Sequence, residues 1–119
     1  KARHVTFVEN YKGILPILKK NLSYFKFLNK YSIIEKDIFN KFDFKILESK
    51  FDIIFLDPPY RESNLIDLLK TIFKNKVLKK EGIIIIHRHK KQKDNFPYPF
   101  KIIEEKKYGI SKIIFGSFY

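Results

Sequence analysis

The chain has 119 residues, of which 45% are hydrophobic and 17% aromatic, so it can bury the core of one domain and is too short for two. It contains no cysteine, which excludes disulfides and thiolate metal sites, and the spacing of its three histidines does not indicate a metal site. A net charge of +12 favours nucleic acid, a polyanion, as the partner. The alternative interpretation is a genomic bias, because Lys, Ile, Asn and Phe, which are abundant here, all have AT-rich codons.

Short apolar runs alternate with longer helical patterns, which predicts an α/β fold with a mostly parallel sheet and an antiparallel hairpin at the C-terminal end. The chain is expected to form a single, partial domain over residues 1–119. In chain order, we expect a strand at 4–8, a helix at 11–28, a strand at 31–34, a short helix or loop at 38–49, strands at 52–56 and 83–86 with a helix at 64–75 between them, and hairpin strands at 101–107 and 111–115. The run at 52–56 is apolar on both faces, which predicts a central strand.

The most informative motif is Asp57-Pro58-Pro59-Tyr60, which follows the apolar run without a gap. In an open α/β sheet, ligands bind beyond the carboxyl ends of the strands, where this tetrapeptide is expected to lie. The alternative interpretation is a proline-rich connection between a core strand and a helix. Its position directly after Phe-Asp-Ile-Ile-Phe-Leu favours a catalytic role.

The residue types of this motif suit methylation of a base amine. An exocyclic amine is a poor nucleophile because its lone pair is delocalised into the ring. Asp57 and the carbonyl of Pro58 are acceptors that can hold the two N–H groups and direct the lone pair at a methyl donor. The prolines hold the turn rigid, and Tyr60 offers a face on which an extruded base can stack.

Phe-Asp-Ile-Ile-Phe-Leu-Asp-Pro-Pro-Tyr resembles the [Asp/Asn]-Pro-Pro-[Tyr/Phe] motif of Rossmann-like amino-methyltransferases. Together with Val-Thr-Phe-Val-Glu-Asn near the start and Tyr-Gly-Ile-Ser-Lys-Ile-Ile-Phe-Gly near the end, it makes the chain similar to the bacterial small-subunit (16S) rRNA guanine-N(2) methyltransferase family. That resemblance covers essentially the whole chain. It implies S-adenosylmethionine as co-substrate, no metal, and rRNA or the ribosomal small-subunit particle as partner.

The resemblance also implies roles for individual residues. Glu9, with Asn10 beside it, matches the acidic strand end that holds the cofactor ribose hydroxyls. Asp37 matches the acidic position near the adenine amino group, with Ile38 beside the ring, and Asp57 also borders the cofactor. Taken alone, Glu9 is equally consistent with a solvent-facing charge and Asp37 with a helix cap.

The chain departs from the family in one respect. Family members have an earlier strand and a glycine-rich loop around the methionine part of the cofactor, and neither is found here among glycines 13, 82, 109 and 116. We therefore expect the first strand to be missing from this chain. Its absence would leave unpaired backbone groups in the middle of the sheet.

Basic residues near the motif are candidates for substrate binding. Pro59, Tyr60 and Arg61 are expected to contact the target nucleotide, although Arg61 could instead pair with Glu62. Arg88 lies in His-Arg-His-Lys-Lys, just after the strand at 83–86, and could bind RNA phosphates or belong to a solvated loop.

Three other functions stay open. Adenine-N(6) methyltransferases of DNA or RNA share the motif, but the short interval between Glu9 and Asp57 leaves no room for a DNA-recognition insert. Glutamine methyltransferases usually have Asn at the position of Asp57. A non-catalytic RNA-binding module with a degenerate methyltransferase fold is the alternative from another class. No apolar run reaches the about 18 to 20 residues of a membrane span and no signal peptide is visible, so a cytoplasmic protein that does not bind membranes is expected. A monomer is expected as well.

Overall fold

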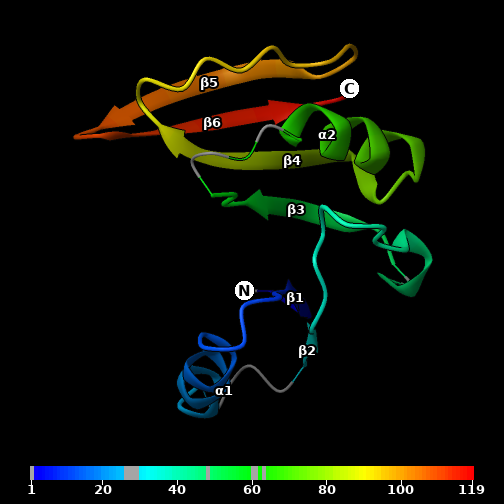
Figure 1. Cartoon of the computed structure of the whole chain (residues 1–119). Coiled ribbons are helices and arrows are strands. Elements are labelled where there is room, and N and C mark those ends of the chain that lie inside the picture. Colours follow the sequence, from blue (N-terminus) through cyan, green and yellow to red (C-terminus); the bar gives the residue numbers. More distant parts are fainter. Residues whose placement is uncertain (1, 26–29, 48, 60–61, 63) are drawn as a thin grey trace. The chain divides into compact units, whose positions relative to one another are not determined.

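The computed structural model describes residues 2–25, 30–47, 49–59, 62 and 64–119. The chain divides into two compact units, Lys1–Asp43 and Phe44–Tyr119. Its strands form a two-stranded sheet of order β1-β2 and a four-stranded sheet of order β3-β4-β6-β5 (Figure 1). The expectation of a single domain over the whole chain stays a prediction.

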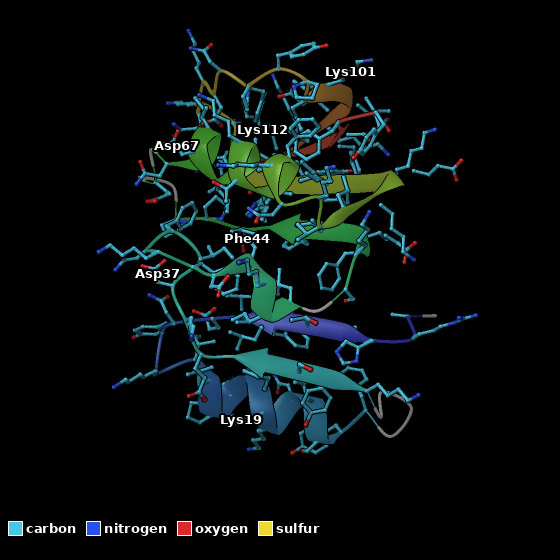
Figure 2. All side chains as sticks on the ribbon, turned by 90° about the vertical axis from the view of Figure 1, so that its right-hand side faces the viewer. Lys19, Asp37, Phe44, Asp67, Lys101 and Lys112 are labelled. Atoms are coloured by element: carbon cyan, nitrogen blue, oxygen red, sulfur yellow. The ribbon has the colours of Figure 1, made fainter. Side chains whose placement is uncertain are left out.

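The first unit is built on two parallel strands, β1 (Val5–Val8) and β2 (Tyr31–Ile34). Val8 is opposite Ile34, so the two strands end at the same edge of their sheet. Helix α1 (Leu15–Ser23) connects them, and Figure 2 shows it alongside the strand pair. Both strands lie where the sequence predicts them.

Helix α1 is shorter than the predicted helix at 11–28. It begins at Leu15, and Pro16 occupies its first turn. Proline disfavours helical geometry in the residue before it and lacks a backbone donor, so it is tolerated only at the start of a helix. Residues 11–14 therefore do not extend the helix, and residues 12–14 form turns instead. Residues 26–29 of the predicted helix lie outside the described residues.

The second unit holds a mixed sheet. After the short 3-10 helix η1 (Phe44–Leu47), β3 (Phe51–Leu56) pairs in parallel with β4 (Leu78–His89). On the other side of β4, the strands β6 (Ser111–Ser117) and β5 (Lys101–Tyr108) add antiparallel. Parallel pairing followed by an antiparallel hairpin confirms the predicted fold class.

One strand does not lie where its sequence suggests. The apolar run of β3 predicts a central strand, but β3 is at the edge of the four-stranded sheet. Ile53 and Phe55 on one of its faces are 62% and 59% exposed. An apolar run indicates that a strand can be buried on both faces. Whether both faces are buried depends on the elements that pack beside the strand.

The core of the second unit lies between its sheet and helix α2 (Leu65–Lys74). The buried side chains of this helix recur at helical spacing and meet the sheet; they are Leu65, Leu68, Leu69 and Ile72. On the sheet, Ile84 and Ile86 of β4 and Ile114 of β6 are almost completely buried. The helix predicted at 64–75 is thus confirmed, with the apolar face that its pattern indicates.

Two glycines shape the hairpin of β5 and β6. Gly109, in the two-residue turn, has a φ of +56°. Residues other than Gly, Asn and Asp rarely adopt this backbone conformation. At Gly116, a Cβ would lie 2.1 Å from Cζ of Phe100. Phe100 packs against Phe96 and Phe118, so Gly116 leaves the room that this aromatic cluster needs.

Candidate functional site

The Asp-Pro-Pro motif lies directly beyond the carboxyl end of β3. The last residue of that strand, Leu56, is paired with Ile86 of β4. Because the two strands are parallel, the residues that follow these two, Asp57 and His87, come next to each other at the same edge of the sheet. Pro58 is buried and Pro59 is exposed.

Asp57 is hydrogen-bonded to His87. Nδ1 of His87 is 2.8 Å from Oδ1 of Asp57, and the side chains are 24% and 58% exposed, respectively. Because an ionised carboxylate only accepts hydrogen bonds, the Nδ1–H of His87 donates to it. The carboxylate is thus accessible to a ligand while one of its oxygens is held by the sheet.

Arg88, the next residue on β4, points to the opposite face. Side chains alternate along a strand, and Arg88 continues the buried row of Ile84 and Ile86. All three are 0% exposed. A guanidinium can be stable in such a place only if its donors are satisfied by acceptors within the protein.

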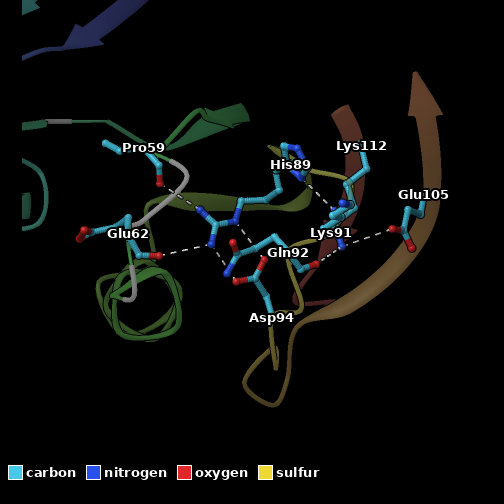
Figure 3. Close-up of polar contacts among 9 residues, drawn as sticks. Pro59, Glu62, His89, Lys91, Gln92, Asp94, Glu105 and Lys112 are labelled. Carbon is cyan, nitrogen blue, oxygen red and sulfur yellow. Dashed lines mark hydrogen bonds and ion pairs between the residues drawn. The ribbon is translucent and has the colours of Figure 1, made fainter. Parts of the chain in front are cut away.

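Those acceptors are a carboxylate and the backbone of the motif segment (Figure 3). Arg88 forms a bidentate pair with Asp94. Its Nε and Nη2 each donate a hydrogen bond of 3.0 Å to one carboxylate oxygen. Its Nη1 also donates to the carbonyl of Pro59 at 3.2 Å, and Nη2 to that of Glu62 at 3.3 Å. The side chain of Asp94 is only 9% exposed. Arg88 therefore connects the backbone at Pro59 and Glu62 to the core of the unit.

This position corrects the predicted role of Arg88. A fully buried guanidinium that is paired with Asp94 does not bind RNA phosphates. The prediction assumed that the strand ends at residue 86, whereas β4 continues through His89 and alternation turns Arg88 inward. Beyond the strand, the backbone N–H of Lys91 donates to Nδ1 of His89, a contact drawn in Figure 3. Tyr60 and Arg61, the other predicted substrate contacts, lie outside the described residues.

In the first unit, the predicted cofactor residues follow the carboxyl ends of β1 and β2. The backbone N–H of Glu9 donates to the carbonyl of Ile34, which keeps the two strand ends together. Glu9 accepts through Oε1 from the backbone N–H groups of Asn10 and Tyr11, at 3.1 and 3.0 Å. The sheet therefore brings this acidic residue to the same edge as the turn that follows β2.

Asp37 is in that turn (Figure 2). Its Oδ1 accepts from the backbone N–H of Phe39 at 2.9 Å, and Asp37 and Ile38 are both half-buried. The first unit thus presents two carboxylates, Glu9 and Asp37, that each use one oxygen to order the local backbone. Asn10 beside them is exposed.

Two residues that the sequence analysis missed as site components are His87 and Asp94. The sequence places His87 only in a basic run, His-Arg-His-Lys-Lys, and indicates no role for Asp94. The parallel pairing of the two apolar runs is the signal that would have placed His87 beside Asp57. No comparable signal marks Asp94, because its approach to Arg88 depends on the course of the loop after β4.

Two structural tests bear on other kinds of site. Within the described ranges, no three His, Cys, Asp or Glu side chains come together as a group that could hold a metal ion. Within the same ranges, no helix has the length and apolar character needed to cross a membrane.

A parallel α/β arrangement with acidic residues at strand ends, an Asp-Pro-Pro motif after β3 and a C-terminal antiparallel hairpin defines the Rossmann-like fold of methyltransferases. The chain belongs to the family described as conserved hypothetical protein 95, whose model matches residues 1–117. This confirms the resemblance seen in the sequence.

Individual relatives carry names that agree with this fold. The chain is 30% identical over 110 residues to an uncharacterized methylase of Rickettsia prowazekii, and 27% identical over 115 residues to the ribosomal RNA small subunit methyltransferase D of Haemophilus influenzae. Each match covers 92% of this chain. A crystal structure of a presumed methylase from Haemophilus influenzae superposes with a TM-score of 0.75 at 26% identity, over 97% of this chain and 72% of that one. The chain spans 42% and 58% of the lengths of the two curated relatives.

Proposed function

We propose that this chain takes part in methyl transfer from S-adenosylmethionine to the exocyclic amine of a guanine in small-subunit rRNA. The observation that carries the proposal is the placement of Asp57. Its carboxylate is exposed at the carboxyl end of β3, is hydrogen-bonded to His87 of β4, and is followed by two prolines, whose φ angles are restricted. Such a held acceptor is what an exocyclic base amine needs in order to react.

Asp57 and Pro58 act on the amine as acceptors. One N–H of the base donates to Asp57 and the other to the carbonyl of Pro58, which turns the nitrogen lone pair toward the methyl group. As the new N–CH₃ bond forms, the methyl–sulfur bond breaks and one amine proton leaves toward Asp57 or solvent. The contribution of the protein is orientation and electrostatic stabilisation, which do not require a covalent intermediate.

The carboxylates of the first unit fit the cofactor. Bound S-adenosylmethionine supplies a methyl group activated by a positively charged sulfur. Glu9 and Asp37 each have a second carboxylate oxygen, which suits the ribose hydroxyls and the adenine amino group, respectively. Asn10 and Ile38 flank these positions, and Ile38 offers an apolar side chain to the adenine ring.

The choice of RNA as substrate rests on charge and on relatives. The net charge of +12 attracts a polyanion through counterion release. One relative is named a ribosomal RNA small subunit methyltransferase. Pro59, Tyr60 and Arg61 directly follow the acceptors and are proposed to contact the target nucleotide. A cytoplasmic protein that acts as a monomer on rRNA or on the small-subunit particle is consistent with these points.

The test is a methylation assay with the full-length protein, radiolabelled S-adenosylmethionine, and three substrates: naked small-subunit rRNA, small-subunit particles and duplex DNA. We expect label in at least one of the two RNA substrates, recovered by mass spectrometry as N(2)-methylguanosine. Asp57→Ala is expected to reduce the rate of methyl transfer by at least about 100-fold, while RNA affinity stays nearly unchanged.

Three outcomes would reject the proposal. Label recovered as N(6)-methyladenine would establish the alternative amino-methyltransferase. RNA binding without any transfer would favour the non-catalytic module. A folded Asp57→Ala protein that loses transfer and RNA binding equally would contradict the role assigned to this carboxylate.

A further inference from the structure

Two adjacent residues of β4 form hydrogen bonds to residues that follow β3 in the chain. His87 binds the side chain of Asp57, and Arg88 binds the backbone carbonyls of Pro59 and Glu62. The two contacts lie on opposite faces of the strand because consecutive side chains alternate. The end of β4 thereby determines the position of the segment that follows β3.

We propose that His87 is a positioning residue, which sets the orientation of the Asp57 carboxylate for methyl transfer. This inference rests on the proposed function, because the orientation of Asp57 matters only if Asp57 binds the reacting amine. His87 is not assigned a contact with substrate or cofactor. We assign its effect on the reaction to the 2.8 Å hydrogen bond between Nδ1 and Oδ1.

The anchoring of His87 supports this role. Its backbone lies within β4 and is paired with Ile113 of β6, so the histidine is fixed by the interior of the sheet. Asp57, by contrast, lies beyond the end of an edge strand, and its side chain is 58% exposed. An exposed aspartate ordinarily rotates among several conformers, and a donor held by the sheet selects one of them.

The contact with His87 leaves the carboxylate of Asp57 able to accept further hydrogen bonds. A carboxylate has two oxygens and about four lone-pair sites, and His87 takes one site on Oδ1. Oδ2 can then accept from the base amine in a direction that the His87 contact defines. A misplacement of about 1 Å in a reacting group can reduce the rate by about 100-fold, so the loss of this single bond should be measurable.

The atoms of the contact suggest a matched set of variants. In His87→Asn, the amide nitrogen is attached to Cγ, as Nδ1 is, so the donor is kept at the same distance along the side chain. In His87→Gln, the amide nitrogen is one bond further away, near the position of Nε2. His87→Ala removes the donor altogether. Asn should therefore restore the contact, whereas Gln, which is equally polar, should not.

The experiment measures single-turnover methylation of small-subunit rRNA or particles by the full-length protein, together with the Kd of RNA and of S-adenosylmethionine. We expect His87→Ala and His87→Gln to lower the rate constant by about 10- to 100-fold, with both Kd values changed by less than about twofold. His87→Asn is expected to recover most of the rate. Far-UV circular dichroism and urea unfolding verify that each variant is folded. If His87→Ala does not fold, the comparison of Asn with Gln decides.

The outcomes separate this inference from the proposed function. If the wild-type protein transfers no methyl group, the proposed function fails and the role of His87 fails with it. If the wild type is active and Asp57→Ala is inactive, but His87→Ala or Gln reacts at the wild-type rate, only the positioning role is overturned. Equal losses in Asn and Gln, or a loss that appears in RNA affinity instead of the rate constant, overturn it as well.

Discussion

Replacement of Arg88 by methionine tests whether this residue belongs to the core or to the RNA-binding surface. Methionine has a similar length and fills most of the space but donates no hydrogen bond. The substitution removes both bonds to Asp94 and those to the carbonyls of Pro59 and Glu62, which span 3.0 to 3.3 Å. It also leaves the carboxylate of Asp94 without its cationic partner, and the side chain of Asp94 is only 9% exposed.

The expected cost follows from that burial. Removing one partner of a buried ion pair costs about 3–5 kcal/mol, because the remaining charge is uncompensated. This is a large part of the about 5–15 kcal/mol by which a domain is stable. In the double variant Arg88→Met/Asp94→Leu, both partners are replaced, so the unpaired buried carboxylate is removed as well. We expect the double variant to be more stable than Arg88→Met alone. The carbonyl of Pro59 keeps its hydrogen bond from the backbone N–H of Glu62 at 2.9 Å, whereas the carbonyl of Glu62 loses the bond from Arg88, at a cost of about 1–3 kcal/mol.

Urea unfolding of the wild type and variants, followed by far-UV circular dichroism, measures these differences. Lys79→Met is the matched control, because Lys79 is also on β4 and pairs with Asp52 at 3.1 Å but is 52% exposed. Its loss should cost less than about 1 kcal/mol. A folded Arg88→Met protein of wild-type stability, with weaker RNA binding, would refute this account and restore the phosphate contact predicted from sequence.

Three further substitutions test the fold and the proposed cofactor site. Gly116→Ala should destabilise the second unit by about 1–3 kcal/mol, because its Cβ meets the ring of Phe100, whereas Gly109→Asn in the turn should be nearly neutral; equal unfolding midpoints in urea would contradict this. Glu9→Ala should raise the Kd of S-adenosylmethionine by about 10- to 100-fold in calorimetric titration of the full-length protein, since it removes a charged acceptor worth about 1.5–3 kcal/mol. An unchanged Kd would show that Glu9 does not bind the cofactor.

Much of the fold could be predicted because local patterns decide it. The β-branched runs at β1, β2 and β3 and the stripe of α2 appear in the sequence at their observed positions. The hairpin was visible as well, because Gly109 supplies the positive φ that its turn needs. The extent of β4 was missed in both directions. A strand that continues into a run of charged residues has no apolar pattern there to reveal it.

The sequence by itself determined the fold class and the family, and it located the Asp-Pro-Pro motif at the end of a strand. These depend on neighbouring residues, on hydrophobic periodicity and on the local stiffness of proline. Only the tertiary structure decided that β3 is an edge strand, that Arg88 is buried with Asp94, and that His87 holds Asp57. Each of these depends on which segments pair and in which register, and pairing brings together residues that are far apart in the chain.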